Sequence, residues 1–373
     1  MALLEVDLDE LEVLRGWASG ERKYTEGQER DWHGRFGSGG GGASKAEDNN
    51  HTLAVAMIGS RNFTRVGDQA RQHAKAEIVA QRGADLAKAA TDNPAVRAEM
   101  RAQYPEGEDG RARLVTDWLD VQYQGSEHYP TPVGMSDEQL YGELKAQQYV
   151  DQWANTAADS DDHSLAMQVA TAQELGAPSP AFDRLLATAV GDNTGDPIKP
   201  SVQEVMDEQG HTMQAFVRSE YTATQAYLKD QGITGSVLLY RGMSFGHDDP
   251  PIPKDWVNGT QSPIQMNPAS SWSVDKLTAT SFGGMGGGGF PLADPDADLA
   301  LLTSRVKVED IISTSRTGRG ALSEGEILVR NTPGMVATPT ILSKPAAAAA
   351  VQEKFPLPPW DPDTLDLGPE PTG

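Results

Sequence analysis

The sequence predicts an α+β protein in which a helical N-terminal domain precedes a C-terminal domain built around a mixed β-sheet. Apolar residues recur at helical spacing from about residue 50 to about residue 230, without a convincing strand. From residue 236 onward, short apolar runs bounded by turn residues indicate buried strands instead. The chain has 373 residues, more than one core usually contains, so two domains are expected. We predict a flexible leader and linker over 1–46, a helical domain over 47–199, a strand-rich domain over 200–345 and a Pro-rich disordered tail over 346–373.

The composition argues against several classes of function. A net charge of -23 disfavours a broad nucleic-acid surface or an anionic membrane as the partner, because both need clustered Lys and Arg. The absence of cysteine rules out disulfides, thiolate zinc sites and cysteine nucleophiles. The acidic N-terminus lacks the pattern of a signal peptide, and no apolar run approaches the roughly 20 residues that span a bilayer. We therefore expect a soluble protein without a membrane or nucleic-acid partner.

The N-terminal leader ends in a segment over 37–43 that is nearly all Gly and Ser, which is typical of a flexible linker. The preceding Asp31-Trp32-His33-Gly34-Arg35-Phe36 is similar to short segments that flank linkers in phage head-associated proteins. This resemblance implies a cytoplasmic or virion-associated location and a role as a phage particle component. A plain linker flank is the alternative explanation.

Helix boundaries are indicated by capping residues. The segment 68–91 is predicted to be helical and to be interrupted at Asp92-Asn93-Pro94. Ser136 with Gln139 forms a capping box, and Ser179-Pro180 predicts a further helix start. A long helix is expected to begin with the capping box at Ser201 and to end at Gly232. These signals justify the predicted helical domain.

The C-terminal domain is predicted from a series of apolar runs. The expected strands are Ser236–Met243, Ala269–Val274, Leu299–Leu302, Val306–Val308 and the run after Glu326, and a short helix is expected over Asp275–Phe282. The glycines of 283–289 lack the Lys-Ser/Thr ending of a phosphate loop and predict a flexible loop. No histidine or acidic cluster has the spacing of a metal site, so no metal is expected.

Two glutamates, Glu324 and Glu326, lead directly into the apolar run 327–329. On a strand, residues i and i+2 point to the same face, so the two carboxylates are expected to project together from the start of a buried strand. Such a pair is disfavoured by mutual repulsion and by burial unless water reaches it or its charge is used. A solvated strand end is the alternative.

Three features occur in a fixed chain order: Arg241 at the end of a strand, Ser271-Trp272-Ser273 before a short helix, and Glu324-x-Glu326 at the start of a strand. This ordered set resembles the Arg-Ser-Glu class of mono-ADP-ribosyltransferases, which includes clostridial binary toxins and related bacterial and phage enzymes. The resemblance covers about 201–340. It implies an ADP-ribosyltransferase-like mixed β-sheet domain, NAD as the substrate and arginine on a host protein as the acceptor.

The resemblance assigns roles to individual residues. Glu326 is expected to bind the ribose of NAD and to stabilise the oxocarbenium-like transition state. Glu324 is expected to orient the acceptor guanidinium and to accept its proton. Arg241 would hold the pyrophosphate, Ser271 would hydrogen-bond Glu326, and Ser273 would support the strand edge.

Tyr240 and Gly242, which flank Arg241, and Phe282, which would pack against the nicotinamide, complete the predicted NAD-binding set. A place in the core is the alternative for both aromatic residues. The middle position of the serine motif is usually Thr, and Trp272 stands there instead, so a register shifted to Ser270 stays open. An NAD glycohydrolase and a non-catalytic virion-associated protein are the alternative functions.

Overall fold

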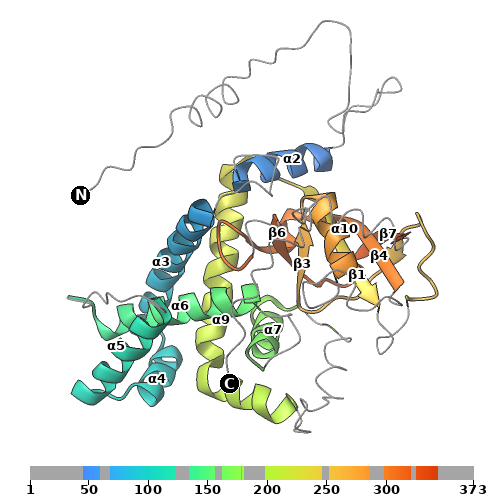
Figure 1. The fold of residues 1–373 in the computed structure, drawn as a ribbon. Helices are drawn as coiled ribbons and strands as arrows, with labels where there is room; N and C mark the ends of the chain where they lie inside the picture. The colour runs from blue at the N-terminus through green and yellow to red at the C-terminus, as the bar shows by residue number, and fades with distance from the viewer. Residues whose placement is uncertain are drawn as a thin grey trace, which may run out of the picture.

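The structure is a computed structural model that describes residues 45–58, 68–122, 134–155, 162–177, 179, 198–245, 252–285, 298–320 and 325–342. It combines helices with one antiparallel sheet, so the predicted α+β class is confirmed (Figure 1). The helices are α2 (Lys45–Ile58), α3 (Asp68–Asp92), α4 (Pro94–Gln103), α5 (Glu108–Gln122), α6 (Asp137–Asn155), α7 (Asp162–Leu175), α9 (Ile198–Asp230) and α10 (Lys276–Met285). Most of the predicted leader, the tail and the helix predicted from Pro180 lie outside the described residues.

Helices α3 to α7 and the first part of α9 share one apolar core, in which Leu86, Leu140 and Phe216 are fully buried. The predicted break between α3 and α4 is confirmed, because the Asn93 side chain accepts a hydrogen bond from the Ala95 amide at 3.0 Å and caps α4. The capping box before α6 is also confirmed. The Ser136 amide donates to Gln139 Oε1 at 2.8 Å, and the Gln139 amide donates to Ser136 Oγ at 3.3 Å.

The long helix α9 begins at Ile198, so the predicted start at Ser201 is wrong. Its backbone is kinked at Gln209, where φ is -150° and ψ is 17°. Glu99 caps the second segment, because its two carboxylate oxygens accept the amides of His211 and Thr212, each at 2.8 Å. The predicted end of the helix is confirmed, since α9 ends at Asp230 and Gly232, two residues later, adopts a left-handed φ of +71°.

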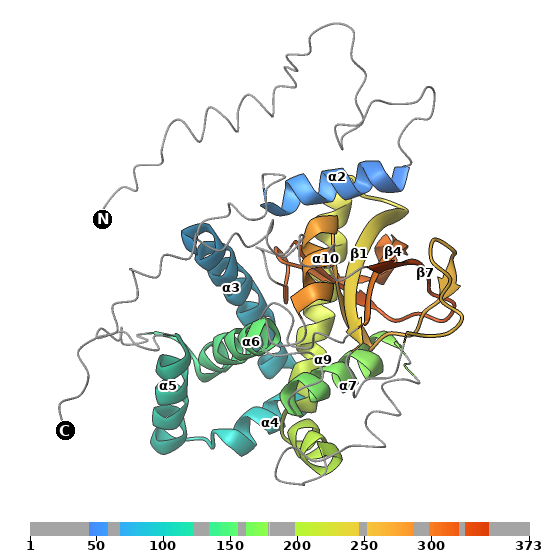
Figure 2. The ribbon, with the colours of Figure 1, turned by 45° about the vertical axis from the view of Figure 1, so that its right-hand side comes forward.

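The sheet has seven strands in the order β2-β7-β4-β1-β3-β6-β5. Their bounds are β1 Ser236–Phe245, β2 Ser262–Pro263, β3 Ala269–Ser273, β4 Asp298–Lys307, β5 Ile311–Thr314, β6 Glu326–Arg330 and β7 Val336–Leu342. The two strands expected within 299–308 form the single strand β4, and the sequence pattern missed β2 and β7. Helix α10 begins close to its predicted start, extends to Met285, and lies along β1 (Figure 2).

A split divides the sheet between β1 and β3. Along the described strands, β1 pairs with β4 over its whole length, but it shares one register pair with β3, Tyr240 with Ser273. Strands β2, β7, β4 and β1 therefore form one half of the sheet, and β3, β6 and β5 form the other. Beyond Tyr240 the two halves diverge.

Helix α2 packs on the sheet, where Leu53 and Met57 join its apolar core. The side chain of Asn49 donates to the carbonyls of Thr234 and Ser236 at 2.6 and 2.8 Å. The side chain of Asn50 donates to the carbonyls of Leu238 and Val274, and so bridges the two halves of the sheet. This placement of α2 differs from the prediction, which assigned its first two residues to the leader and the rest to the helical domain.

The expected boundary at 199/200 does not separate two cores. Helix α9 runs from the helical bundle to the sheet (Figure 1). It contributes Met213 and Phe216 to the helical core and Leu228 to the core of the sheet. The helix therefore contributes to both cores.

Candidate active site

The predicted site residues occupy three adjacent strands. Arg241 is in β1, Ser271 and Ser273 are in β3, and Glu326 is the first residue of β6. The strand register places Tyr240 opposite Ser273 and Ser273 opposite Glu326. Since directly paired residues share a face, these three side chains form one row across the split. The three sequence features therefore lie on adjacent strands, with Tyr240 rather than Arg241 in the row of Ser273 and Glu326.

Arg241 spans the split. Its Nη1 donates a hydrogen bond to the carbonyl oxygen of Ser271 at 2.5 Å, and the side chain is partly buried. By strand alternation Arg241 leaves β1 on the face opposite to Tyr240, and therefore opposite to Ser273 and Glu326. Its length brings the guanidinium to the edge of β3. A ligand that contacts both Arg241 and Glu326 must therefore cross β3 near residues 271–273.

The register exchanges the roles predicted for the two serines. Ser271 lies opposite Leu328, whereas Ser273 lies opposite Glu326, so Ser273 is the hydroxyl next to the carboxylate. Ser273 Oγ also accepts the Asp275 amide at 3.0 Å, which ties the end of β3 to the start of α10.

The open question about Ser270 is answered by its contacts. Ser270 lies opposite Val329, and its Oγ accepts the Trp272 indole N–H at 3.0 Å. Trp272 is 2% exposed and packs in the core with Leu239 and Ile327. The bulky residue at the middle of the serine motif therefore points into the core, and Ser270 serves to satisfy its indole N–H.

Glu326 is buried, with an exposure of 8%. Gly325 precedes it with a left-handed φ of +56°, and β6 begins only at Glu326. Strand alternation aligns two residues only if the residue between them is extended, and Gly325 is not extended. Glu324 itself lies outside the described residues.

The remaining predicted NAD-binding residues are near the split but differ in position. Tyr240 is 6% exposed and packs against Ala279 and Leu301, in agreement with the core alternative. Gly242 lies opposite Leu301 in β4. Phe282 is within α10, and its side chain is outside the described part of the chain.

A buried ion pair near Glu326 was missed by the sequence analysis. Glu220 in α9 and Arg319 in the loop before β6 are both fully buried, and they bind each other. The signal was present in the sequence, because Glu220 lies four residues from Phe216 and from Thr224 on the inward face of its helix. A charge at such a position predicts a buried partner.

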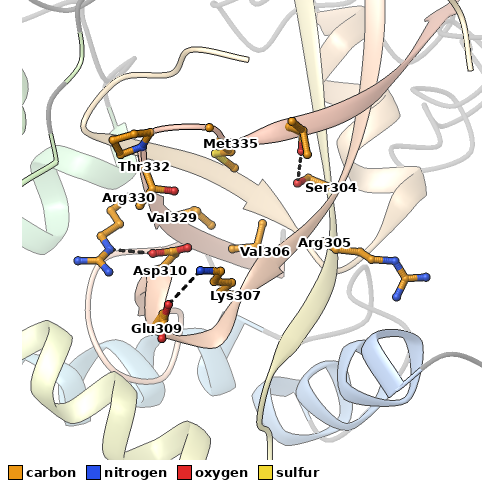
Figure 3. Close-up of a pocket in the computed structure, with 13 residues that line it drawn as sticks. Ser304, Arg305, Val306, Lys307, Glu309, Asp310, Val329, Arg330, Thr332 and Met335 are labelled. Atoms are coloured by element: carbon orange, nitrogen blue, oxygen red, sulfur yellow. Dashed lines mark hydrogen bonds and ion pairs between the residues drawn. The ribbon is translucent and has the colours of Figure 1, made fainter. Parts of the chain in front are cut away.

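A cavity of about 430 Å³ lies apart from the predicted site (Figure 3). It is lined by the end of β4, the short helix Val308–Asp310 that follows, the end of β6 and the start of β7. Four of its charged lining residues pair with one another: Arg330 Nε lies 2.9 Å from Asp310 Oδ1, and Lys307 Nζ lies 3.3 Å from Glu309 Oε1. Its lining includes none of the predicted site residues.

Within the described residues, no group of three or more His, Asp or Glu side chains is arranged to hold a metal ion. None of the described helices is both long and apolar enough to cross a membrane. No protein-family model, curated protein or solved structure matches the chain.

Proposed function

We propose that the protein is an NAD-dependent mono-ADP-ribosyltransferase that modifies arginine on a protein acceptor. The observation that supports this proposal is the placement of Arg241, Ser273 and Glu326 on three adjacent strands, with Ser273 directly opposite Glu326 and Arg241 bonded to the Ser271 carbonyl across the split. These residue types are the ones that the reaction requires, and they come from segments separated by up to 85 positions in the sequence.

The reaction breaks the bond between C1′ of the ribose and the nicotinamide nitrogen of NAD. Nicotinamide leaves as a neutral molecule, and positive charge develops on the ribose. The buried Glu326 carboxylate would stabilise this charge, because an electrostatic interaction is stronger where water is excluded. The acceptor guanidinium then forms a new bond from its nitrogen to C1′ and gives up one proton, for which Glu324 is the proposed base.

Arg241 and Ser273 would hold the substrate and the carboxylate. A guanidinium has five N–H donors in a planar fork, so Arg241 can bind a pyrophosphate while it contacts the Ser271 carbonyl. Ser273, directly opposite Glu326, would take the orienting role that the family resemblance implies for Ser271. The dinucleotide would cross β3, with its pyrophosphate at the split and its nicotinamide ribose at the start of β6.

Substitution Glu326→Gln tests the proposal, because it keeps the shape of the side chain and removes its charge. The purified protein is incubated with NAD labelled in the adenylate phosphate and with a lysate of the source organism. We expect protein-bound label with the wild type and a loss of about 100-fold or more with Glu326→Gln. Glu309→Gln is the matched control, because Glu309 is 64% exposed and remote from the split. Undiminished labelling by Glu326→Gln would reject the assignment.

NAD hydrolysis is the second candidate reaction. The loop over 315–320 contains no aromatic residue that would dock an acceptor protein. In a glycohydrolase, water would take the place of the acceptor guanidinium. The ratio of free ADP-ribose to protein-bound label in the same assay separates transfer from hydrolysis.

A further inference from the structure

The loop over 315–320 connects β5 to the segment that leads into Glu326, and a fully buried ion pair anchors it to α9. Arg319 Nε lies 3.2 and 3.1 Å from the two carboxylate oxygens of Glu220, and Arg319 Nη2 lies 2.7 Å from Oε2. The backbone amide of Arg319 also donates to Glu220 Oε1 at 2.6 Å. Both side chains have an exposure of 0%. One carboxylate therefore fixes both the side chain and the backbone of Arg319.

Further contacts hold the same loop from other elements. Thr317 Oγ1 lies 2.7 Å from Thr224 Oγ1 in α9. Arg316 Nε donates to the carbonyl oxygen of Met57 at the end of α2 at 2.6 Å. Ser313 Oγ in β5 donates to the carbonyl oxygen of Arg319 at 2.7 Å. The loop is thus attached to two helices and one strand.

The glycines of the loop transmit this anchoring to Glu326. A Cβ atom at Gly318 would lie 2.2 Å from Glu220 Oε1, so only glycine lets the backbone pass this close to the carboxylate. Gly320 has a left-handed φ of +142°, and a Cβ atom there would lie 3.3 Å from the carbonyl oxygen of Glu326. The loop therefore makes close backbone contacts both with Glu220 and with the residue of the predicted site.

A buried ion pair is a poor source of stability, because apolar residues of similar volume often stabilise a fold equally well or better. The directional hydrogen bonds of the pair instead fix the position of Arg319 relative to α9. We propose that Glu220 and Arg319 are positioning residues that fix the loop over 315–320 and thereby set the Glu326 carboxylate at the split. This inference rests on the proposed function of Glu326.

The double substitution Glu220→Met/Arg319→Met separates position from stability. It removes both charges at once, so neither is left buried without its partner, but the Arg319 amide loses its acceptor. The thermal midpoint is therefore expected to fall by no more than about 10 °C. If the pair positions Glu326, the turnover of NAD falls about 100-fold although the protein is folded, because small displacements of reacting groups have effects of this size. The Kd of NAD is expected to change less than threefold. A folded double variant with the turnover of the wild type would overturn the proposal.

A matched control is available on the same helix. Arg218 binds Glu174 through two hydrogen bonds of 2.6 and 2.7 Å, but this pair connects α9 to α7 and is more exposed. Arg218→Met/Glu174→Met should leave turnover unchanged. If the Glu220→Met/Arg319→Met variant does not fold, Arg319→Lys takes its place, since lysine keeps the charge and loses the planar fork. Wild-type turnover in folded Arg319→Lys would equally overturn the proposal.

Hydrogen exchange separates failure of this inference from failure of the proposed function. The amides of Thr317, Gly318 and Arg319 are expected to exchange at least tenfold faster in the double variant, while the amides of β4 exchange as in the wild type. If the wild type neither transfers nor hydrolyses NAD, the proposed function is wrong, and the exchange rates alone decide whether the pair fixes the loop. Unchanged protection of these three amides would contradict the proposal that the Glu220–Arg319 pair fixes the loop.

Discussion

Lys145 lies in the core of the helical region and should make the free energy of unfolding depend on pH. The substitution Lys145→Met should remove this dependence. Its side chain is 5% exposed, and its Nζ donates to Gln209 Oε1 at 3.3 Å. Burial lowers the pKa of Lys145 from 10.5 to about 8, although Glu208, Asp117 and Glu99 act in the opposite direction. Between these two pH values the unfolded chain binds more protons than the folded protein, so stability rises with pH.

The size of the effect follows from the two pKa values. The difference between 10.5 and about 8 corresponds to about 3 kcal/mol of stability that is present above pH 10.5 and lost as the pH falls through 8. Burial also raises the pKa of Tyr141 and Tyr149 above the usual 10, so these groups reduce stability above about pH 10. The effect of Lys145 is therefore measured between pH 7 and 9.5, where it amounts to about 2 kcal/mol.

Substitution Lys145→Met removes the buried ammonium and leaves Gln209 Oε1 bonded to the Tyr149 hydroxyl at 3.0 Å. Urea unfolding of both proteins at pH 7 and pH 9.5 gives the free energies of unfolding. We expect Lys145→Met to be more stable than the wild type at pH 7, and the difference to shrink by about 2 kcal/mol at pH 9.5. A difference that is independent of pH would refute the reasoning.

Three further substitutions test the geometry of the sheet. Gly325→Ala should lower the free energy of unfolding by about 1–2 kcal/mol in urea titrations, because alanine is strained at a φ of +56°. An unchanged free energy of unfolding would contradict the left-handed turn before β6. Gln168→Ala should lower the free energy of unfolding by about 3 kcal/mol, because the buried Gln168 amide binds the N–H and the carbonyl of Ala269 at 2.7 and 2.8 Å. The control Gln173→Ala, at an exposed position, should lower it by less than about 0.5 kcal/mol, and equal losses would refute the contact between α7 and β3. Arg241→Lys should raise the Kd of NAD at least about tenfold by calorimetry, because lysine lacks the planar fork, and an unchanged Kd would remove Arg241 from the site.

The sequence predicted the local parts of the fold well where one residue determines the backbone. Asn93-Pro94, Ser136 with Gln139, and Gly232 each act within a few residues, and the structure confirms all three. The start of α9 was misjudged, because Ser201 has the residue type of a cap but the helix continues to Ile198.

In the candidate site, too, the order of the residues could be predicted from the sequence, but their tertiary arrangement could not. The order of Arg241, Ser271-Trp272-Ser273 and Glu326 was visible in the sequence, but the register that pairs Ser273 with Glu326 was not. Register depends on which residues of β3 and β6 face the core, and Trp272 decides this by occupying it. Docking of α2 by Asn49 and Asn50 depends on contacts between residues more than 180 positions apart, which no local pattern reveals.

Binding of NAD at the split is open to a test by hydrogen exchange of the full-length protein with and without saturating NAD. The proposed site predicts slower exchange in β1 beyond Tyr240, in β3 and at the start of β6, and unchanged exchange around the cavity at residues 304–307 and 332–336. Protection confined to the cavity, or no protection anywhere, would contradict an NAD site formed by Arg241, Ser273 and Glu326.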